Sequence, residues 1–175
     1  GSGLAALGED ENGEPLVKPA DKISAEQFLH LMEGKNPLTG EALQPGRTTP
    51  GNAGRVVGYD IGVSADKSVS ILWATGDEET RRKIEEAFDA SVDAAVEYLE
   101  EHACRVRKGA GGVHQARGEG LVIGVFHHTT ARPTQEGVPG DPHLHAHLVV
   151  ANITRGPDGK LQALHSPELF AHYRT

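Results

Sequence analysis

The segment His143-Leu144-His145-Ala146-His147, followed by Leu148-Val149-Val150-Ala151, decides the fold class. Its histidines recur at every second position, which is the period of a β-strand and turns their side chains to one face. The β-forming residues behind them extend the predicted strand from His143 to Ile153. We therefore predict a strand that presents a row of imidazoles, a row suited to holding a divalent metal ion.

Further strands are predicted on both sides of this one. The sequence indicates strands from Arg55 to Val63 and from Leu121 to about Thr129, and Cys104–Arg107 precedes a glycine-rich turn. Gly156-Pro157-Asp158-Gly159 is a strong turn signal, after which Leu161–Leu164 is expected to pair back as an edge strand. Residues 35–53 and 131–141 are expected to be loops.

Capping signals and apolar spacing predict the helices. Ser24 with Gln27 forms a capping box for a short helix that Gly34 ends, and Ser64 is expected to cap a helix that runs to Trp73. Thr75 with Glu78 is a second capping box before the longest helix, and Ser166-Pro167-Glu168 opens the last one. The longest helix carries an apolar stripe at helical spacing: Ile84, Phe88, Val92, Ala95, Val96 and Leu99.

Strands joined by hairpins, with helices grouped between them, predict an α+β fold with an antiparallel sheet. The length of 175 residues fits one domain. We expect a helix- and loop-rich part at 1–53 and a sheet core at 54–175. The longest apolar runs are too short to cross a membrane, so no membrane insertion is expected. Cys104 is the only cysteine, which excludes an internal disulfide and a thiolate zinc cluster and makes a cytoplasmic location the default.

The net charge of −8 is unevenly distributed. Residues 1–50 hold eight acids and four bases, residues 77–102 hold ten acids and three bases, and the remainder is net positive. Within that remainder, residues 104–117 carry four bases and no acid: Arg105, Arg107, Lys108 and Arg117. This basic stretch predicts a loop that contacts phosphates, and a solvated hairpin is the alternative.

Five of the ten histidines fall within residues 127–147. Histidines two apart on a strand are about 6.6 Å apart at Cα, which suits two imidazoles on one ion, whereas His143 and His147 are about 13 Å apart. We therefore expect two ligands from this strand and a third from His127 or His128, which end the preceding strand. A surface row of histidines and a cupin-like metal sheet remain alternatives, and no His-Glu-x-x-His motif supports a zinc protease.

Several segments together resemble the relaxase domain of conjugative plasmid proteins, the TrwC/TraI type of the HUH endonuclease superfamily. They are Gly58-Tyr59-Asp60, Ser64-Ala65-Asp66-Lys67-Ser68-Val69-Ser70, Leu72-Trp73-Ala74, Gly120-Leu121-Val122, Phe126-His127-His128, Asp141-Pro142-His143-Leu144-His145-Ala146-His147, Val149-Val150-Ala151-Asn152 and Leu164-His165-Ser166. Their order and spacing agree with the family over nearly the whole chain.

The resemblance implies a central antiparallel sheet with flanking helices. It also implies an enzyme that nicks single-stranded DNA at a plasmid transfer origin: a tyrosine attacks the phosphodiester and joins the 5′ phosphate, leaving a 3′ hydroxyl. Relaxosome or coupling proteins are the implied partners. The implied cofactor is one divalent ion, such as Mg²⁺, Mn²⁺, Zn²⁺ or Ni²⁺.

The family's functional residues fall on named positions of this chain. Its metal-binding histidines correspond to His128, His145 and His147, whereas His143 stands where relatives often have another polar residue. Its aspartate, which orients a histidine or activates the tyrosine, falls on Asp60, for which a strand-end aspartate bonded to backbone is the alternative. Lys67 and Ser68 open a helix and are expected to contact a phosphate, and solvated side chains are the alternative.

Two departures from the family pattern stand out. Relatives usually read Ala-Pro-Lys-Ser where this chain has Ala65-Asp66-Lys67-Ser68, which puts an acid near the phosphate site. None of Tyr59, Tyr98 and Tyr173 matches the family's nucleophile, which lies upstream of the matching region. We therefore expect an inactive fragment that lacks the tyrosine segment and the C-terminal part. The alternatives are a non-catalytic module that binds DNA or a partner, and an unrelated cupin-like metal-dependent enzyme.

Overall fold

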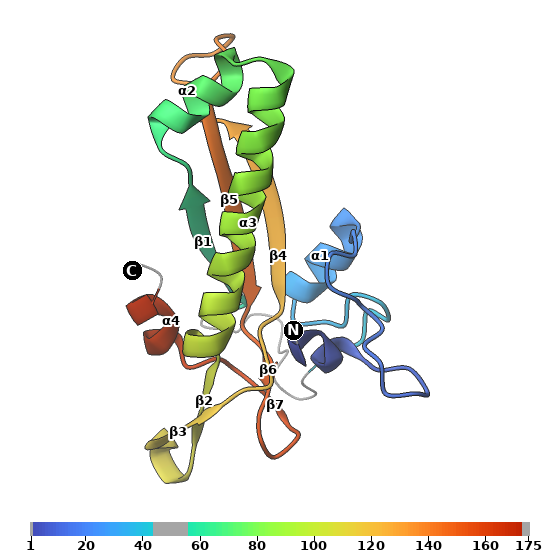
Figure 1. Ribbon diagram of the computed structural model, residues 1–175. Helices are drawn as coiled ribbons and strands as arrows, with labels where there is room; N and C mark the ends of the chain where they lie inside the picture. Colours follow the sequence, from blue (N-terminus) through green and yellow to red (C-terminus); the bar gives the residue numbers. More distant parts are fainter. Residues whose placement is uncertain (1, 44–55, 173–175) are drawn as a thin grey trace. The chain divides into compact units, whose positions relative to one another are not determined.

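The computed structural model describes residues 2–43 and 56–172, and Figure 1 labels its helices and strands. In chain order the elements are η1 (Ser2–Leu7), α1 (Ala25–Met32), β1 (Gly58–Ser64), α2 (Lys67–Thr75), α3 (Glu78–Ala103), β2 (Arg105–Lys108), η2 (Ala110–Gly112), β3 (His114–Arg117), β4 (Ile123–Thr130), β5 (Pro142–Ala151), β6 (Thr154–Arg155), β7 (Leu161–Gln162) and α4 (Ser166–His172).

The chain divides into two compact units. The first comprises Gly1–Tyr59, Tyr98–Gly124 and Val150–Thr175, and the second comprises Asp60–Glu97 and Val125–Val149. The expected single domain with a division at residues 53 and 54 stays a prediction, and Arg55 and Tyr173 lie outside the described residues.

The main sheet has the strand order β1-β5-β4, so the histidine strand is central (Figure 1). β1 and β5 are antiparallel: the Ala65 N–H donates to the Leu144 carbonyl, and the Asn152 N–H donates to the Val57 carbonyl. β2 with β3 and β6 with β7 form two further antiparallel pairs. The α+β prediction with an antiparallel sheet is thus confirmed, as is the turn that leads into β7.

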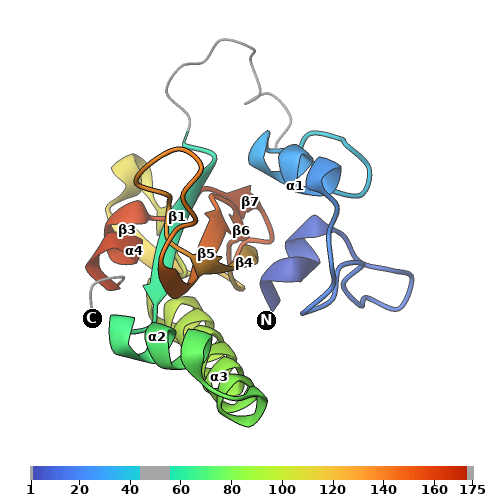
Figure 2. The same cartoon turned by 90° about the horizontal axis from the view of Figure 1, so that it is seen from above.

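β5 has the alternating character that the sequence predicted. Leu144, Ala146 and Leu148 are buried, whereas His143, His145 and His147 between them are partly exposed. In the second unit both helices, α2 and α3, lie on one face of the strands (Figure 2). The imidazoles therefore occupy the face that carries no helix of this unit.

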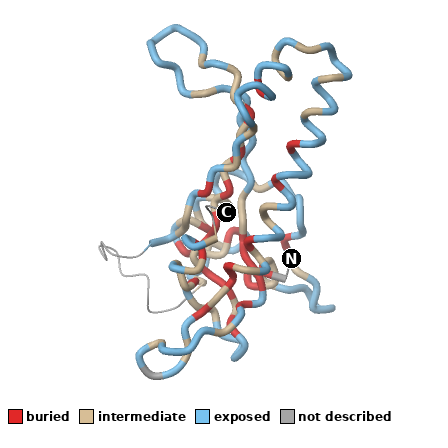
Figure 3. The backbone as a smooth tube through the Cα atoms, turned by 60° about the vertical axis from the view of Figure 1, so that its left-hand side comes forward, coloured by how far each residue is buried: buried red, intermediate tan, exposed pale blue. Residues whose placement is uncertain are grey.

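The predicted capping box of α1 and the predicted apolar stripe of α3 are both present. The Ser24–Gln27 capping box of α1 is present. Along α3 the stripe residues Phe88 and Val92 are buried, and Figure 3 shows such isolated buried turns along an otherwise exposed helix. This is the burial expected of an amphipathic helix.

The expected caps of α2 and α3 were wrong. The Ala65 N–H still bonds to the neighbouring strand, so β1 continues through Ser64 and α2 begins only at Lys67. Thr75 is the last residue of α2, and the Asp77 carboxylate instead accepts the Thr80 N–H at 2.8 Å at the start of α3. Hydrogen bonds from the Thr80 side chain and from this N–H stabilise the charged form and lower the pKa of Asp77.

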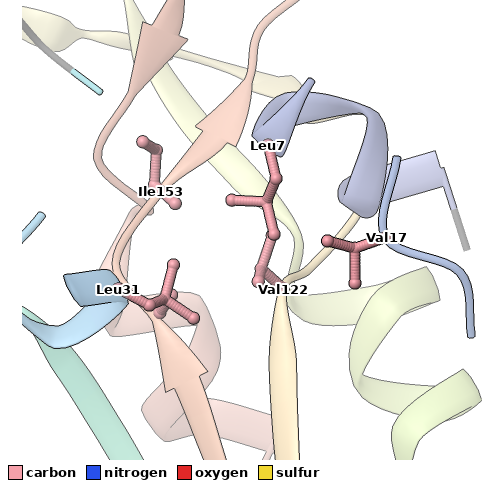
Figure 4. Close-up of a cluster of buried hydrophobic side chains, with 6 residues drawn as sticks. Leu7, Val17, Leu31, Val122 and Ile153 are labelled. Carbon is pink, nitrogen blue, oxygen red and sulfur yellow. The ribbon is translucent and has the colours of Figure 1, made fainter. Parts of the chain in front are cut away.

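The first unit has its own apolar core (Figure 4), formed by Leu7, Val17, Leu31, Val122, Ala151 and Ile153. Full burial of such a side chain contributes about 1.5–3 kcal/mol, so this cluster is a main source of the unit's stability. Cys104 is also buried, and desolvation raises the pKa of its thiol. Among the described residues, no helix has the length and apolar character needed to cross a bilayer.

Candidate metal centre and nucleic-acid contacts

Three imidazoles from neighbouring strands form a nearly equilateral triangle in the second unit. The ring centroids are 5.2 Å apart for His128 and His145, 5.3 Å for His128 and His147, and 5.4 Å for His145 and His147. β5 contributes two of the rings because strand side chains two apart share a face, and β4 contributes the third. These are the three histidines that the resemblance selected.

The spacing of the rings fits one shared ion. An ion bound through one nitrogen lies roughly 3.2 Å from the ring centroid, because the zinc–nitrogen bond is about 2.0–2.1 Å. Three rings around a tetrahedral ion therefore have centroids about 5.2 Å apart. The triangle has this size, and an all-imidazole donor set suits zinc, copper and nickel.

The orientation of the rings differs from that of three ligands around one ion. Within residues 2–43 and 56–172, no three His, Cys, Asp or Glu side chains are already arranged to hold an ion. The rings of His128 and His145 stack at an interplanar angle of 21°, so their edges do not converge on one point. The terminal torsion of a histidine side chain is broad, and rotation of the His128 ring about it would change this stack without moving the strands.

Asp60 on β1 fixes one of the rings. Nδ1–H of His147 donates to both carboxylate oxygens of Asp60, each at 2.9 Å. The hydrogen-bond partners assign the tautomer: with Nδ1 protonated, Nε2 keeps its lone pair for a ligand. The alternative of an aspartate satisfied by backbone groups is wrong, because both of its oxygens bond to an imidazole.

The space beside this pair is open. Gly62 is two residues from Asp60 on β1 and so shares its face, and a side chain added there would meet nothing within 4 Å. The side chains of His147 and Asp60 are 40% and 59% exposed. The Asp60–His147 pair and the sheet face beside it are therefore open to solvent.

His127 and His128 face opposite ways, although the sequence alone left both as ligand candidates. His127 contacts the outer helix α3: its Nδ1 is 3.5 Å from the Asp89 carboxylate, and its ring packs edge-on against Phe88 at 6.0 Å. His128 lies with the other imidazoles. Only His128 of the two therefore belongs to the triangle.

Two contributors to this region were missed by the sequence reasoning. The His143 ring stacks on His145 with centroids 4.5 Å apart. The hydroxyl of Ser70, which is fully buried, accepts the Leu144 N–H at 3.0 Å and so holds the histidine strand to α2. Ser70 stands in a segment that resembles the family, but its role was not predicted, because its partner is 74 residues away.

Lys67 and Ser68 lie at the start of α2 and are exposed. Lys67 Nζ donates to the Pro142 carbonyl at 3.1 Å and is 3.3 Å from the Asp141 carboxylate. Lys67 therefore ties α2 to the start of β5. A phosphate contact by either residue stays a prediction.

The basic stretch forms the β2–β3 hairpin of the first unit, and two of its four bases are used internally. Arg105 donates to the carbonyls of Glu101 and Cys104 at the C-terminal end of α3, where a cation is favourable. Lys108 pairs with Asp158 at 2.7 Å.

Arg107 and Arg117 remain exposed on this hairpin. The register pairs Arg105 with Arg117 and Arg107 with Gln115, so side-chain alternation puts all three arginines on one face. Like charges directly opposite one another are unfavourable, and an anion relieves that repulsion.

The two described tyrosines have their ring contacts in the first unit. Tyr59 packs edge-on against Phe170 at 5.6 Å, and the Tyr98 hydroxyl lies 3.0 Å from His172 Nδ1. Neither contact involves the histidine triangle.

Comparison with known proteins identifies the family. The family model described as TrwC relaxase matches residues 1–175. The multifunctional conjugation protein TraI of Escherichia coli is 30% identical over 154 residues, which cover 87% of this chain and 8% of that protein. The chain thus spans less than a tenth of the length of this relative.

Solved structures agree with the sequence match. The conjugative relaxase TrwC in a metal-bound complex with oriT DNA has a TM-score of 0.70 at 30% identity, covering 87% of this chain and 49% of that one. TrwC complexed with a 27-mer DNA comprising the recognition hairpin and the cleavage site has a TM-score of 0.69 at 31% identity, covering 88% and 51%. By its sequence over residues 1–175, and in agreement with its fold, the chain belongs to the TrwC relaxase family.

Proposed function

We propose that this chain is the metal-binding core of a conjugative relaxase, which nicks single-stranded DNA at a plasmid transfer origin by tyrosine transesterification. The observation that carries the proposal is the triangle of three imidazoles, one of them held by Asp60, on an open sheet face in a member of the TrwC family. A cupin-like enzyme is disfavoured by the family match over residues 1–175.

His128, His145 and His147 would hold the ion through imidazole nitrogens. The bound divalent ion would supply positive charge at the scissile phosphate, where negative charge develops during transesterification. TrwC has been solved in metal-bound form with oriT DNA, which supports both a metal and a DNA ligand for this chain. The four candidate metals, Mg²⁺, Mn²⁺, Zn²⁺ and Ni²⁺, remain open.

Asp60 has a positioning role in this proposal. Its carboxylate keeps the His147 Nδ1 protonated and so directs Nε2 toward the ligand position. The same carboxylate would favour a cation nearby, because it carries a full negative charge within the site. A direct role in taking the tyrosine proton is the second possibility that the family pattern offers.

The attacking tyrosine is proposed to be none of Tyr59, Tyr98 and Tyr173. Its hydroxyl oxygen would bond to the phosphorus while the 3′ oxygen leaves and takes up a proton, so a 5′ phosphotyrosine and a 3′ hydroxyl result. A cytoplasmic location and relaxosome partners are proposed with this reaction, since plasmid DNA is its substrate.

The test is incubation with a transfer-origin oligonucleotide and Mn²⁺, followed by denaturing electrophoresis. The 175-residue chain should give no covalent band, and the same chain extended by the segment that carries the family tyrosines should give one. His145→Ala in the extended chain should abolish the band. A band from the short chain would place the nucleophile among its own tyrosines and overturn this assignment.

DNA binding by the β2–β3 hairpin is a separate part of the proposal. Replacing Arg107 and Arg117 by glutamine should weaken single-stranded DNA binding and flatten its salt dependence, because fewer counterions are released. The matched control is Lys108→Gln, whose charge is already paired with Asp158. DNA binding without any adduct from the extended chain would favour the non-catalytic binding module.

A further inference from the structure

His143 lies outside the imidazole triangle but has the closest ring contact in the histidine row. Its ring is 4.5 Å from that of His145 at an interplanar angle of 20°, compared with 5.2–5.4 Å within the triangle. Its carbonyl oxygen also lies 3.0 Å from His145 Nδ1. His143 therefore contacts His145 through both its ring and its backbone.

The strand segment that carries His143 is held from three directions. The Leu144 N–H donates to the buried Ser70 hydroxyl at 3.0 Å, and the Leu144 carbonyl accepts the Ala65 N–H at 2.9 Å. The preceding carbonyl, that of Pro142, accepts from Lys67 Nζ at 3.1 Å. Because the backbone on both sides is fixed, the His143 ring and carbonyl form a rigid support.

The two contacts restrict different properties of His145: its tautomer and the rotation of its ring. The carbonyl accepts a proton from Nδ1, which selects the tautomer whose Nε2 is unprotonated. The stack limits rotation about the terminal side-chain torsion, which is otherwise broad for histidine. Together they present a nitrogen lone pair in one direction.

We propose that His143 is a positioning residue, which holds the His145 imidazole in its ligand-binding orientation without binding the ion itself. The inference rests on the proposed metal site. Direct ligation is disfavoured because the His143 and His145 rings, with centroids 4.5 Å apart, are closer than the about 5.2 Å of two imidazoles that share a tetrahedral ion, and because His143 and His147 are about 13 Å apart along the strand.

Two substitutions in the full chain separate stacking from ligation. His143→Phe keeps a flat ring and has no donor nitrogen, whereas His143→Ala removes the ring and leaves the carbonyl. In calorimetric titrations with Ni²⁺, the phenylalanine variant should bind within about twofold of the wild type, and the alanine variant about tenfold more weakly, the lower end of the range for outer contacts of a metal site. His127→Ala, on the opposite sheet face, should bind like the wild type.

Copper provides a second readout. The Cu²⁺ electron paramagnetic resonance spectrum should show the same number of nitrogen ligands in the wild type and in His143→Phe. Loss of one nitrogen and an equal loss of affinity in both variants would make His143 a ligand and overturn the proposal. An alanine variant that binds as tightly as the wild type would overturn it too.

Nuclear magnetic resonance of the metal-free protein distinguishes this inference from the proposed function. The ¹⁵N shifts of His145 should report the Nδ1–H tautomer in the wild type and in both variants, because the His143 carbonyl remains, whereas the order of the His145 ring should fall only in His143→Ala, because the stack is lost. That pattern in a wild-type protein that binds no metal would overturn the proposed function and leave the positioning intact. Metal binding with an unchanged order of the His145 ring and an unchanged affinity in His143→Ala would overturn the inference alone.

Discussion

Replacing Asp60 by asparagine removes the charge next to the histidine triangle but keeps an oxygen that can accept the His147 Nδ1–H. Both carboxylate oxygens lie 2.9 Å from that nitrogen, so an ion on the opposite ring nitrogen would be roughly 6 Å from the carboxylate. The variant therefore separates the electrostatic contribution of Asp60 from its role as a hydrogen-bond acceptor.

The solvent exposure of Asp60 and His147 determines how much the Asp60 charge contributes to ion binding. Asp60 and His147 are 59% and 40% exposed, so a water-like dielectric applies. A single negative charge about 6 Å from a divalent ion is then worth about 1.4 kcal/mol, or about a tenfold change in affinity. Because the Debye length is about 8 Å at 0.15 M salt, screening should reduce this to about threefold.

Calorimetry with Ni²⁺ at low and at physiological ionic strength measures both values. Asp60→Ala should weaken binding further than Asp60→Asn, because it also frees the His147 ring. The matched control is Asp89→Asn, since Asp89 pairs with His127 on the opposite face. Equal affinities for wild type, Asp60→Asn and Asp60→Ala would refute the reasoning, as would an equal loss in Asp89→Asn.

Three further predictions concern stability and reactivity. Ser70→Ala leaves the buried Leu144 N–H without its acceptor and should destabilise the protein by about 1–3 kcal/mol in urea unfolding. Ser68 is exposed, so the control Ser68→Ala should change the free energy of unfolding by no more than about 0.5 kcal/mol. Because its hydrogen bonds lower the pKa of Asp77, its contribution to stability is present above the ordinary aspartate pKa and is lost as the pH falls through the lowered one. Asp77→Asn keeps an acceptor for the Thr80 N–H and should remove this acid-dependent part, measured by thermal unfolding between pH 3 and 6; an unchanged pH profile would count against it. Since burial raises the pKa of the Cys104 thiol, thiol reagents at neutral pH should label it only as the protein unfolds, and rapid labelling of the folded chain would contradict its burial.

The sequence predicted those features that depend on local periodicity. Alternation of imidazoles with Leu144 and Ala146 was enough to predict β5 and its two faces, since side chains along a strand alternate. The Ser24 capping box was likewise confirmed, because the donor and acceptor are three residues apart. The choice of His128 came from the family pattern, since spacing alone did not distinguish it from His127.

Features that depend on distant contacts were missed or misplaced. Ser64 looked like a helix cap, but hydrogen bonding of β1 to β5 extends the strand past it. Four bases without an acid suggested one phosphate-binding stretch, yet Arg105 is used at the end of α3 and Lys108 pairs with Asp158. Each of these outcomes depends on partners that only folding brings together.

The central claim is that one divalent ion binds to His128, His145 and His147. Titration of the wild type and of the three single alanine variants with Cu²⁺, followed by calorimetry and by electron paramagnetic resonance, tests it most directly. We predict one ion per chain with three nitrogen ligands in the wild type, and a large loss of affinity in each variant but not in His127→Ala. Binding of equal strength in the wild type and in all three variants would contradict the claim.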